Sequence, residues 1–242
     1  MTPTDLPFSQ AEFRTRQEKT QKEMAARGLD VLFITDPSNQ AWLTAYDGWS
    51  FYVHQGVIQP VDDDPMWWGR NQDANGALRT CWMSGDRILG YADHFVQSTV
   101  CHPMEDLAER LKALGYEQAR IGVEMDNYYF SAKAMEVLRK ELPKAHFVDA
   151  TALVNWQRMV KSDAEIAFMR KAAQISEKII DGLVERVEPG IPKNEIVAEI
   201  FRDSIRGVDG AWGDYAAIVP LLPSGSDAAA PHLTWDGRPF KK

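Results

Sequence analysis

A histidine close to the end of the chain has the surroundings that are most typical of a catalytic group. His232 follows an apolar run, Tyr215–Leu222, and a loop of Pro, Ser and Gly at residues 223–226. The run has the length and composition of a buried strand, and a histidine beyond such a strand and loop can face an active-site cleft. Because imidazole titrates near neutral pH, His232 could take up and return a proton during hydrolysis. The alternative is a loop histidine that bonds a backbone carbonyl.

Other side chains could bind a substrate. Residues 49–55 interleave aromatic and polar groups, including Phe51 and His54. This pattern suits either a ligand-binding wall or a half-buried strand with two alternating faces. Arg70 begins a polar run, and its guanidinium could hold a carboxylate through paired N–H groups. A solvated loop is the plainer interpretation of that run. Asp214 could belong either to a site or to a turn.

No residue set in the sequence has the spacing of a metal site or of a common catalytic motif. His94 and His102 flank Cys101 without metal-ligand spacing, so we interpret both histidines as structural. The two cysteines form no CxxC pair, so we expect two reduced, buried thiols. GxxxxGK[ST], GxGxxG, GxSxG and HExxH are all absent. We therefore assign no metal and no cofactor to these residues. Nucleotide-driven chemistry and the commonest serine and zinc hydrolase designs are disfavoured.

Length and charge limit the class of protein. With 242 residues, 45% of them hydrophobic, the chain can bury the core of one large domain or of two smaller ones. The formal net charge of −8 argues against nucleic acid and anionic membranes as partners. The sequence has no signal-peptide pattern and no run of about 18 apolar residues. We expect a cytoplasmic protein that does not span a membrane.

Helices and strands are expected to alternate in the first part of the chain. Capping residues and apolar periodicity predict helices over residues 11–27, 41–43, 103–114 and 131–141. Short apolar runs predict strands over residues 29–35, 51–59, 66–69, 88–91, 120–124 and 146–148. This alternation predicts an α/β domain with a largely parallel or mixed sheet.

The pattern changes near Lys161. Ser162 and Glu165 fit a capping box at the start of a long helix, and a second helix begins at Pro192. The apolar run that precedes His232 follows these two helices. We therefore divide the chain into two domains, residues 1–157 and 158–242.

Several long runs resemble a known family. The runs are DPSNQAWLTAYDGWSFYVHQ (36–55), GRNQDANGALRT (69–80), GVEMDNYYFSA (122–132), VDATALVNWQRMVKS (148–162) and GDYAAIVPLLPSGSDAAAPHLTWD (213–236). They resemble the ectoine hydrolases, a branch of the creatinase/prolidase family. The segment RMVKSDAEI, from Arg158 to Ile166, is similar to the entry of the pita-bread domain shared by creatinase, prolidase, aminopeptidase P and methionine aminopeptidase. The resemblance implies a creatinase-type N-terminal α/β domain followed by the first part of a pita-bread α+β domain.

The resemblance also implies an activity and an assembly. Ectoine hydrolases open the cyclic amidine ectoine to N-acetyl-2,4-diaminobutyrate, and the family forms homodimers in which each N-terminal domain covers the partner's site. His232 matches the creatinase histidine that moves a proton beside the scissile C–N bond, and Phe51 matches an aromatic residue lent by the partner. Creatinase has an arginine for the substrate carboxylate near Phe51, where this chain has Val53 and His54, so Arg70 is the substitute candidate.

The same resemblance suggests that this chain is the front part of a longer enzyme and is inactive by itself. The metallopeptidase members of the family hold two metal ions through residues that lie beyond Lys242 in such relatives, whereas creatinase works without metal. Two alternatives stay open. One is another reaction on this fold, by an Xaa-Pro metallopeptidase or a dimethylsulfoniopropionate lyase. The other is a non-catalytic fragment that at most dimerises, with the apolar helix stripes at 166–183 and 196–205 left uncovered.

Overall fold

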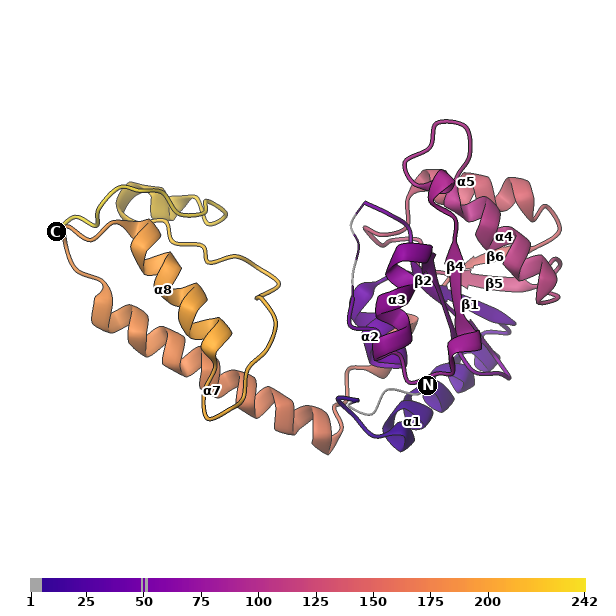
Figure 1. The fold of residues 1–242 in the computed structure, drawn as a ribbon, viewed down its shortest axis with the longest axis horizontal. Helices are drawn as coiled ribbons and strands as arrows, with labels where there is room; N and C mark the ends of the chain where they lie inside the picture. The colour runs from indigo at the N-terminus through magenta and orange to yellow at the C-terminus, as the bar shows by residue number, and fades with distance from the viewer. Residues whose placement is uncertain (1–5, 49, 51) are drawn as a thin grey trace. The chain divides into compact units, whose positions relative to one another are not determined.

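The computed structural model describes residues 6–48, 50 and 52–242 of the chain. The chain divides into two compact units, Met1–Val160 and Lys161–Lys242. The first unit holds the β-sheet and the helices α1 to α6, and the second holds α7 and α8 (Figure 1). No helix in these described ranges is both long and apolar enough to cross a lipid bilayer.

The first unit is built on a mixed sheet of six strands in the order β4-β3-β2-β1-β5-β6. The strands are β1 (Val31–Ile34), β2 (Gly56–Pro60), β3 (Met66–Arg70), β4 (Ile88–Tyr91), β5 (Arg120–Val123) and β6 (His146–Asp149). β2 runs antiparallel to both of its neighbours, and all other neighbouring strands are parallel. Five strands therefore point the same way. Their carboxyl ends lie in one row with the start of β2, and we call this row of strand ends the edge of the sheet.

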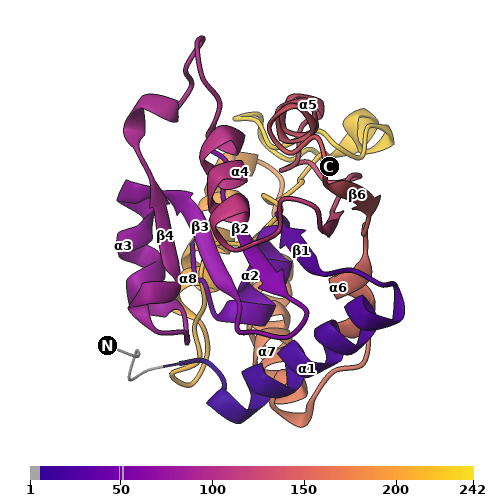
Figure 2. The same cartoon turned by 90° about the vertical axis from the view of Figure 1, so that its right-hand side faces the viewer.

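Helices pack on both faces of this sheet (Figure 1, Figure 2). One face is covered by α1 (Gln10–Ala26), α2 (Pro37–Thr44), α3 (Asn71–Thr80) and α6 (Leu153–Gln157), and the other by α4 (Pro103–Ala113) and α5 (Ala132–Glu141). The side chains of Ser9, Asp36 and Ser131 accept hydrogen bonds from backbone N–H groups three residues later. These caps satisfy donors that the first turn of a helix otherwise leaves unpaired, so they fix where α1, α2 and α5 begin.

The core strands are apolar along their whole length because both faces are covered. All four residues of β1 are buried, and they alternate between the two core clusters, with Leu32 in one and Phe33 in the other. Trp67 and Trp68 of β3 divide in the same way. The α/β architecture with a mixed sheet, which the sequence predicts, is confirmed.

Two local predictions in the first unit are wrong. The polar run after Arg70 is the helix α3 and not a loop, because Ala74 and Ala77 lie one turn apart and pack into the core. This burial outweighs the low helix propensity of the glycine between them. The strand predicted from residue 51 begins only at Gly56. Residues 52 and 53 form a bend, and Phe51 lies outside the described residues.

The second unit begins with the two predicted helices. α7 (Asp163–Arg186) starts at a complete capping box, in which Ser162 Oγ accepts from Glu165 N and Ser162 N donates to the Glu165 carboxylate. α8 (Lys193–Arg206) ends at Gly207, whose φ of 65° is in the left-handed region that favours glycine. An ion pair of 3.0 Å joins Arg186 of α7 to Asp203 of α8. The capping box and both helices are confirmed.

The predicted strand Tyr215–Leu222 is wrong. The segment is irregular, and Ile218 is 73% exposed. A strand needs a neighbouring strand for its backbone N–H and C=O groups. All strands in the described part of the chain belong to the sheet of the first unit, so this segment has no strand to pair with. Its apolar composition alone does not produce a strand.

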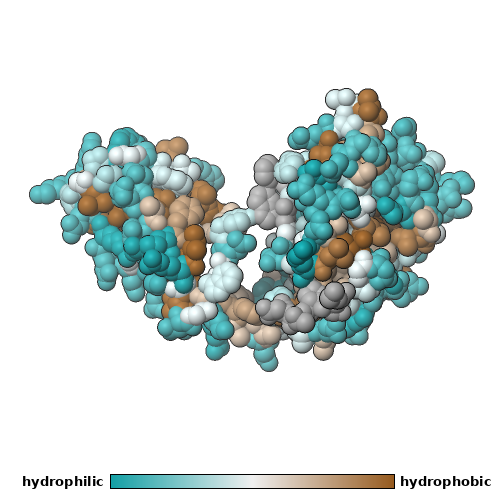
Figure 3. All heavy atoms as spheres, in the orientation of Figure 1, coloured by the Kyte–Doolittle hydropathy of each residue, from teal (hydrophilic) through white to brown (hydrophobic). Residues whose placement is uncertain are grey.

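Apolar side chains lie at the surface of the second unit (Figure 3). The only buried residue of α7 is Gly182, whereas Val184 and Ile180 are 73% and 58% exposed. α8 does contribute buried apolar residues, Ile196 and Val197. The apolar face that the sequence pattern predicts on α7 is therefore present but is not covered within this unit.

Candidate functional site

The candidate residues of the first unit lie at one edge of the sheet, where five strands end and β2 begins. Arg70 is the last residue of β3, and His54 lies two residues before β2. α/β sheets place their ligands outside the carboxyl ends of parallel strands. This edge is therefore the part of the first unit that is best placed to contribute to a binding site.

Tyr91 bonds to the backbone of His54 and is the register partner of Arg70. It is the last residue of β4 and lies opposite Arg70 in the parallel register. Its buried ring lies with its centre 4.8 Å from that of Trp68, and its hydroxyl donates a 2.8 Å hydrogen bond to the backbone carbonyl of His54. Sequence reasoning missed Tyr91, although a polar aromatic residue at the end of the short apolar run ILGY was a usable signal.

A cavity of about 120 Å³ lies at this edge, between the segment before β2 and the loop after β4. Its walls include His54, Tyr91, Phe95, Cys101 and His102. Aromatic rings and a few polar groups are the typical lining of a small-molecule site.

Two histidines face each other in the wall of this cavity. The ring centres of His54 and His102 are 4.9 Å apart. His102 caps α4, because its Nδ1 accepts a hydrogen bond from Met104 N while its own backbone N–H donates to the Glu105 carboxylate. Burial, followed by the charge of His102, lowers the pKa of His54 from 6.5 to about 4, and burial also lowers the pKa of His102. Both rings are neutral at pH 7, so His54 can bind a substrate by hydrogen bonding or stacking but not by charge.

Acidification is expected to destabilise the protein through His54. The folded state holds the His54 proton more weakly than the unfolded state does, so stability is complete above pH 6.5 and falls towards pH 4. At pH 5, about 1.5 units below the ordinary pKa, this residue should lower the free energy of unfolding by about 2 kcal/mol relative to pH 8. Urea denaturation followed by tryptophan fluorescence at both pH values would measure the change.

The matched variants for this test are His54→Gln and His146→Gln. The first removes the titrating ring, so the variant should lose about 2 kcal/mol less than the unaltered protein between pH 8 and pH 5. The second replaces an exposed histidine at the start of β6 and controls for the substitution of a histidine by glutamine. Equal pH dependence in the unaltered protein and in His54→Gln would show that His54 is not the titrating group.

Arg70 is held by an acid and keeps most of its donors free. Its Nε donates a 2.8 Å hydrogen bond to Asp93 Oδ1, and Asp93 lies two residues beyond β4. Within the described part of the chain, its Nη1 and Nη2 atoms make no hydrogen bond. The hydrogen bond from Arg70 lowers the pKa of Asp93, so both groups are charged at neutral pH. Such a guanidinium can still receive a carboxylate through its terminal N–H groups.

Glu124 is a buried acid at the same edge that sequence reasoning missed. It follows β5, is 2% exposed, and accepts hydrogen bonds of 2.7 Å from Thr35 N, 2.8 Å from Asp36 N and 2.6 Å from Asn39 Nδ2. Burial is the largest influence on its pKa and raises it. The signal in the sequence is a lone acid directly after the apolar run IGV. This carboxylate ties the end of β1 and the start of α2 to the end of β5.

The hydrogen bonds of Glu124 continue to the end of the first unit. Asn39 donates to Asn155 Oδ1 at 2.9 Å and accepts from Arg158 Nη1 at 2.6 Å. Arg158 lies two residues before the last residue of the unit. A second cavity of about 220 Å³ adjoins Glu124, Asp36 and Asn155. This network therefore fixes the exit of the chain from the first unit.

His232 and Asp214 lie in the second unit. Asp214 Oδ1 accepts a 2.8 Å hydrogen bond from Tyr215 N, which is the bond of a turn residue. His232 is exposed, and its ring makes no hydrogen bond or ion pair with any residue in the described ranges. The ring is therefore available to a ligand or to another part of a site.

The segment after His232 is anchored to α8. Buried Lys193 forms a 3.0 Å ion pair with Asp236, and Arg238 also donates to Asp236, which lowers the pKa of this carboxyl. Backbone hydrogen bonds join Lys193 N to Arg238 O and Phe240 N to Ile191 O. His232 thus lies between a short 3₁₀ helix, η3 (Gly225–Ala229), and a fixed point on α8.

The described residues contain no group of three or more His, Cys, Asp and Glu side chains close enough to hold a metal ion.

Comparison with known proteins shows which proteins the chain is similar to. Residues 16–160 match the creatinase/prolidase N-terminal domain family. The ectoine hydrolase of Halomonas elongata is 53% identical over the whole of this chain, which covers 62% of that protein. A creatinase from a Bacillus species is 25% identical over 78% of this chain, which covers 44% of that protein.

Solved structures agree on the fold. The prolidase of Thermococcus sibiricus aligns with 95% of this chain at a TM-score of 0.76 and 16% identity, and the aligned part is 59% of that protein. The Xaa-Pro dipeptidase of Bacillus anthracis aligns with 95% of this chain at 0.72 and 17% identity, and the aligned part is 58% of that protein. The family model and the 53% identical relative confirm the resemblance drawn from the sequence, and the chain belongs to the creatinase/prolidase family.

Proposed function

We propose that this chain belongs to an enzyme that hydrolyses ectoine to N-acetyl-2,4-diaminobutyrate. The observation that carries the proposal is the 53% identity to the Halomonas elongata ectoine hydrolase over the whole length of this chain. The family model alone would fit several reactions, whereas this relative is named for one. The chain spans 62% of that relative, so the activity is assigned to the protein that contains this chain.

Hydrolysis of a cyclic amidinium consumes one water and moves the protons of that water to the departing nitrogen. The water oxygen bonds to the amidine carbon, one ring C–N bond breaks, and the departing nitrogen takes up the protons that the oxygen loses as it becomes the amide carbonyl. A neutral histidine can take the proton from the attacking water and return it to that nitrogen. We assign this role to His232, whose ring is exposed and makes no hydrogen bond or ion pair within the described part of the second unit.

The substrate also carries a carboxylate and a cationic amidinium, which need partners of opposite charge. Arg70 supplies free guanidinium N–H groups for the carboxylate. Neutral His54 can stack on the ring or bond to it, and Phe51 is proposed as an aromatic contact. Asp214 is proposed as a carboxylate that stabilises the amidinium. These assignments place the proton transfer in the second unit and substrate binding mostly in the first.

We further propose a homodimer in which the first unit of each subunit contributes to the site of its partner. The family resemblance supports this arrangement. In such a dimer, one site takes His232 from one subunit and Arg70 from the other. The small-molecule substrate and the second copy of the chain are then the two partners of the protein.

Ectoine consumption tests the proposed function. Proton NMR would follow ectoine and its product with this chain and with the product of the complete reading frame that contains it. The expected result is an acetyl-diaminobutyrate from the latter protein. Unchanged ectoine in both samples would contradict the assignment, and proline dipeptides and dimethylsulfoniopropionate, each with added metal, would be the next substrates.

A further inference from the structure

Two Arg–Asp ion pairs lie at opposite ends of the parallel strands β3 and β4. Arg70 and Asp93 pair at the carboxyl ends, and Arg87 and Asp63 pair at the amino ends. The two pairs are similarly exposed. The side chains of Arg70 and Asp93 are 19% and 66% exposed, and those of Arg87 and Asp63 are 26% and 51% exposed. The two pairs therefore differ mainly in geometry and in location.

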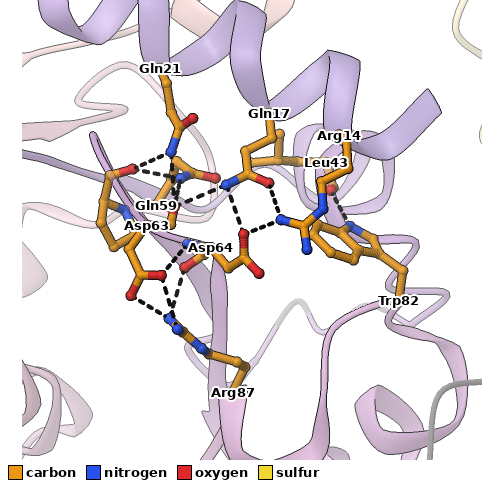
Figure 4. A network of polar contacts seen from close by, with 10 residues as sticks. Arg14, Gln17, Gln21, Leu43, Gln59, Asp63, Asp64, Trp82 and Arg87 are labelled. Carbon is orange, nitrogen blue, oxygen red and sulfur yellow. Dashed lines mark hydrogen bonds and ion pairs between the residues drawn. The ribbon is translucent and has the colours of Figure 1, made fainter. Parts of the chain in front are cut away.

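The pair at the amino ends uses the terminal nitrogens of its arginine. Arg87 donates to the two carboxylate oxygens of Asp63, from Nη1 at 2.7 Å and from Nη2 at 2.9 Å (Figure 4). Arg87 Nη1 also donates to the Asp64 carbonyl oxygen, and the neighbouring Gln17 and Gln59 bond to the Asp63 carbonyl oxygen. This arginine joins the β2–β3 turn to the start of β4 and has a structural role.

The pair at the carboxyl ends uses the opposite side of the guanidinium. Asp93 accepts only from Nε of Arg70, at 2.8 Å, and Nη1 and Nη2 have no hydrogen-bond partner among the described residues. A guanidinium is planar, so a bond at Nε orients both terminal nitrogens. Tyr91, buried beside Arg70 and bonded to the His54 carbonyl oxygen, fixes the strand end from which Arg70 projects.

We infer that Asp93 is a positioning residue, which holds Arg70 at Nε so that Nη1 and Nη2 receive the substrate carboxylate. The inference rests on the proposed function. It assigns Asp93 no contact with substrate, because its carboxylate would repel that of the ligand. Its contribution is to restrict the rotamers of Arg70 before the ligand binds. Arg70 then loses less conformational entropy when a carboxylate binds, so the free-energy cost of binding is lower.

Four variants of the complete protein test this role, with KM and kcat for ectoine as the measurements. Arg70→Ala should raise KM about tenfold or more with little change in kcat, because a charge-assisted bond made equally in ground and transition states is lost. Asp93→Ala should raise KM about threefold to tenfold. Asp93→Asn should stay near the unaltered KM, because its amide oxygen still accepts from Nε. Asp63→Ala breaks the matched pair at the other end and should leave KM unchanged.

The outcomes separate this inference from the proposed function. If the unaltered protein leaves ectoine unchanged, the function fails and the positioning role fails with it. If the protein is active but Arg70→Ala or Asp93→Ala keeps a normal KM, only the positioning role is overturned. A lower KM in Asp93→Ala would mean that Asp93 competes with the substrate, and a raised KM in Asp63→Ala would mean general destabilisation. Each of these two results also overturns the inference.

Discussion

Replacing Glu124 with alanine is expected to lower the free energy of unfolding by about 3 kcal/mol or more. The substitution leaves Thr35 N, Asp36 N and Asn39 Nδ2 without the acceptor that they now share. A buried donor without a partner costs about 1–3 kcal/mol, and water from the adjoining cavity should recover only part of this loss. Urea denaturation at pH 7 would measure the change.

Two further variants make this test specific. Glu124→Gln keeps one accepting oxygen and should give an intermediate loss of stability. Glu136→Ala removes an acid of α5 that forms only an exposed ion pair with Lys133, so it should change stability by less than about 0.5 kcal/mol. A loss below about 1 kcal/mol in Glu124→Ala would mean that the network does not stabilise the fold.

The network around Glu124 also illustrates a limit of sequence reasoning. Its partners are 85 to 89 positions away in the chain, and they meet only because β1 and β5 are parallel neighbours in the sheet. No local pattern contains that information. The same holds for Arg70 and Asp93, which lie 23 positions apart and are joined by the register of β3 and β4.

Local sequence signals were sufficient where the interacting residues are close together in the chain. Ser162 and Glu165 are three residues apart and cap each other, so the start of α7 could be predicted from two letters of the sequence. Short apolar runs bounded by turns were likewise sufficient to predict β1, β3 and β4. The segment Tyr215–Leu222 has a similar composition and is not a strand, because strand formation depends on a neighbouring strand that the run itself does not specify.

The largest expected effect on activity comes from His232→Ala. In the complete protein this variant should lower kcat for ectoine by about 100-fold or more, the usual contribution of one acid–base group. Because His232 is exposed and makes no hydrogen bond among the described residues, its removal should leave the unfolding temperature unchanged. Ectoine consumption followed by proton NMR would measure kcat. His146→Ala, at an exposed histidine of the first unit, is the matched control and should keep full activity.

Mixing two impaired variants would test both the role of His232 and the proposed dimer. If one site takes His232 from one subunit and Arg70 from the other, a mixed dimer of His232→Ala and Arg70→Ala contains one site with both residues intact. Subunits unfolded together and refolded as a mixture should therefore regain activity at low ectoine concentration that neither variant has alone. If both residues of a site come from the same subunit, every site in the mixture lacks one of them and no activity returns. Near-normal turnover by His232→Ala itself would remove His232 from the mechanism, whatever the mixture does.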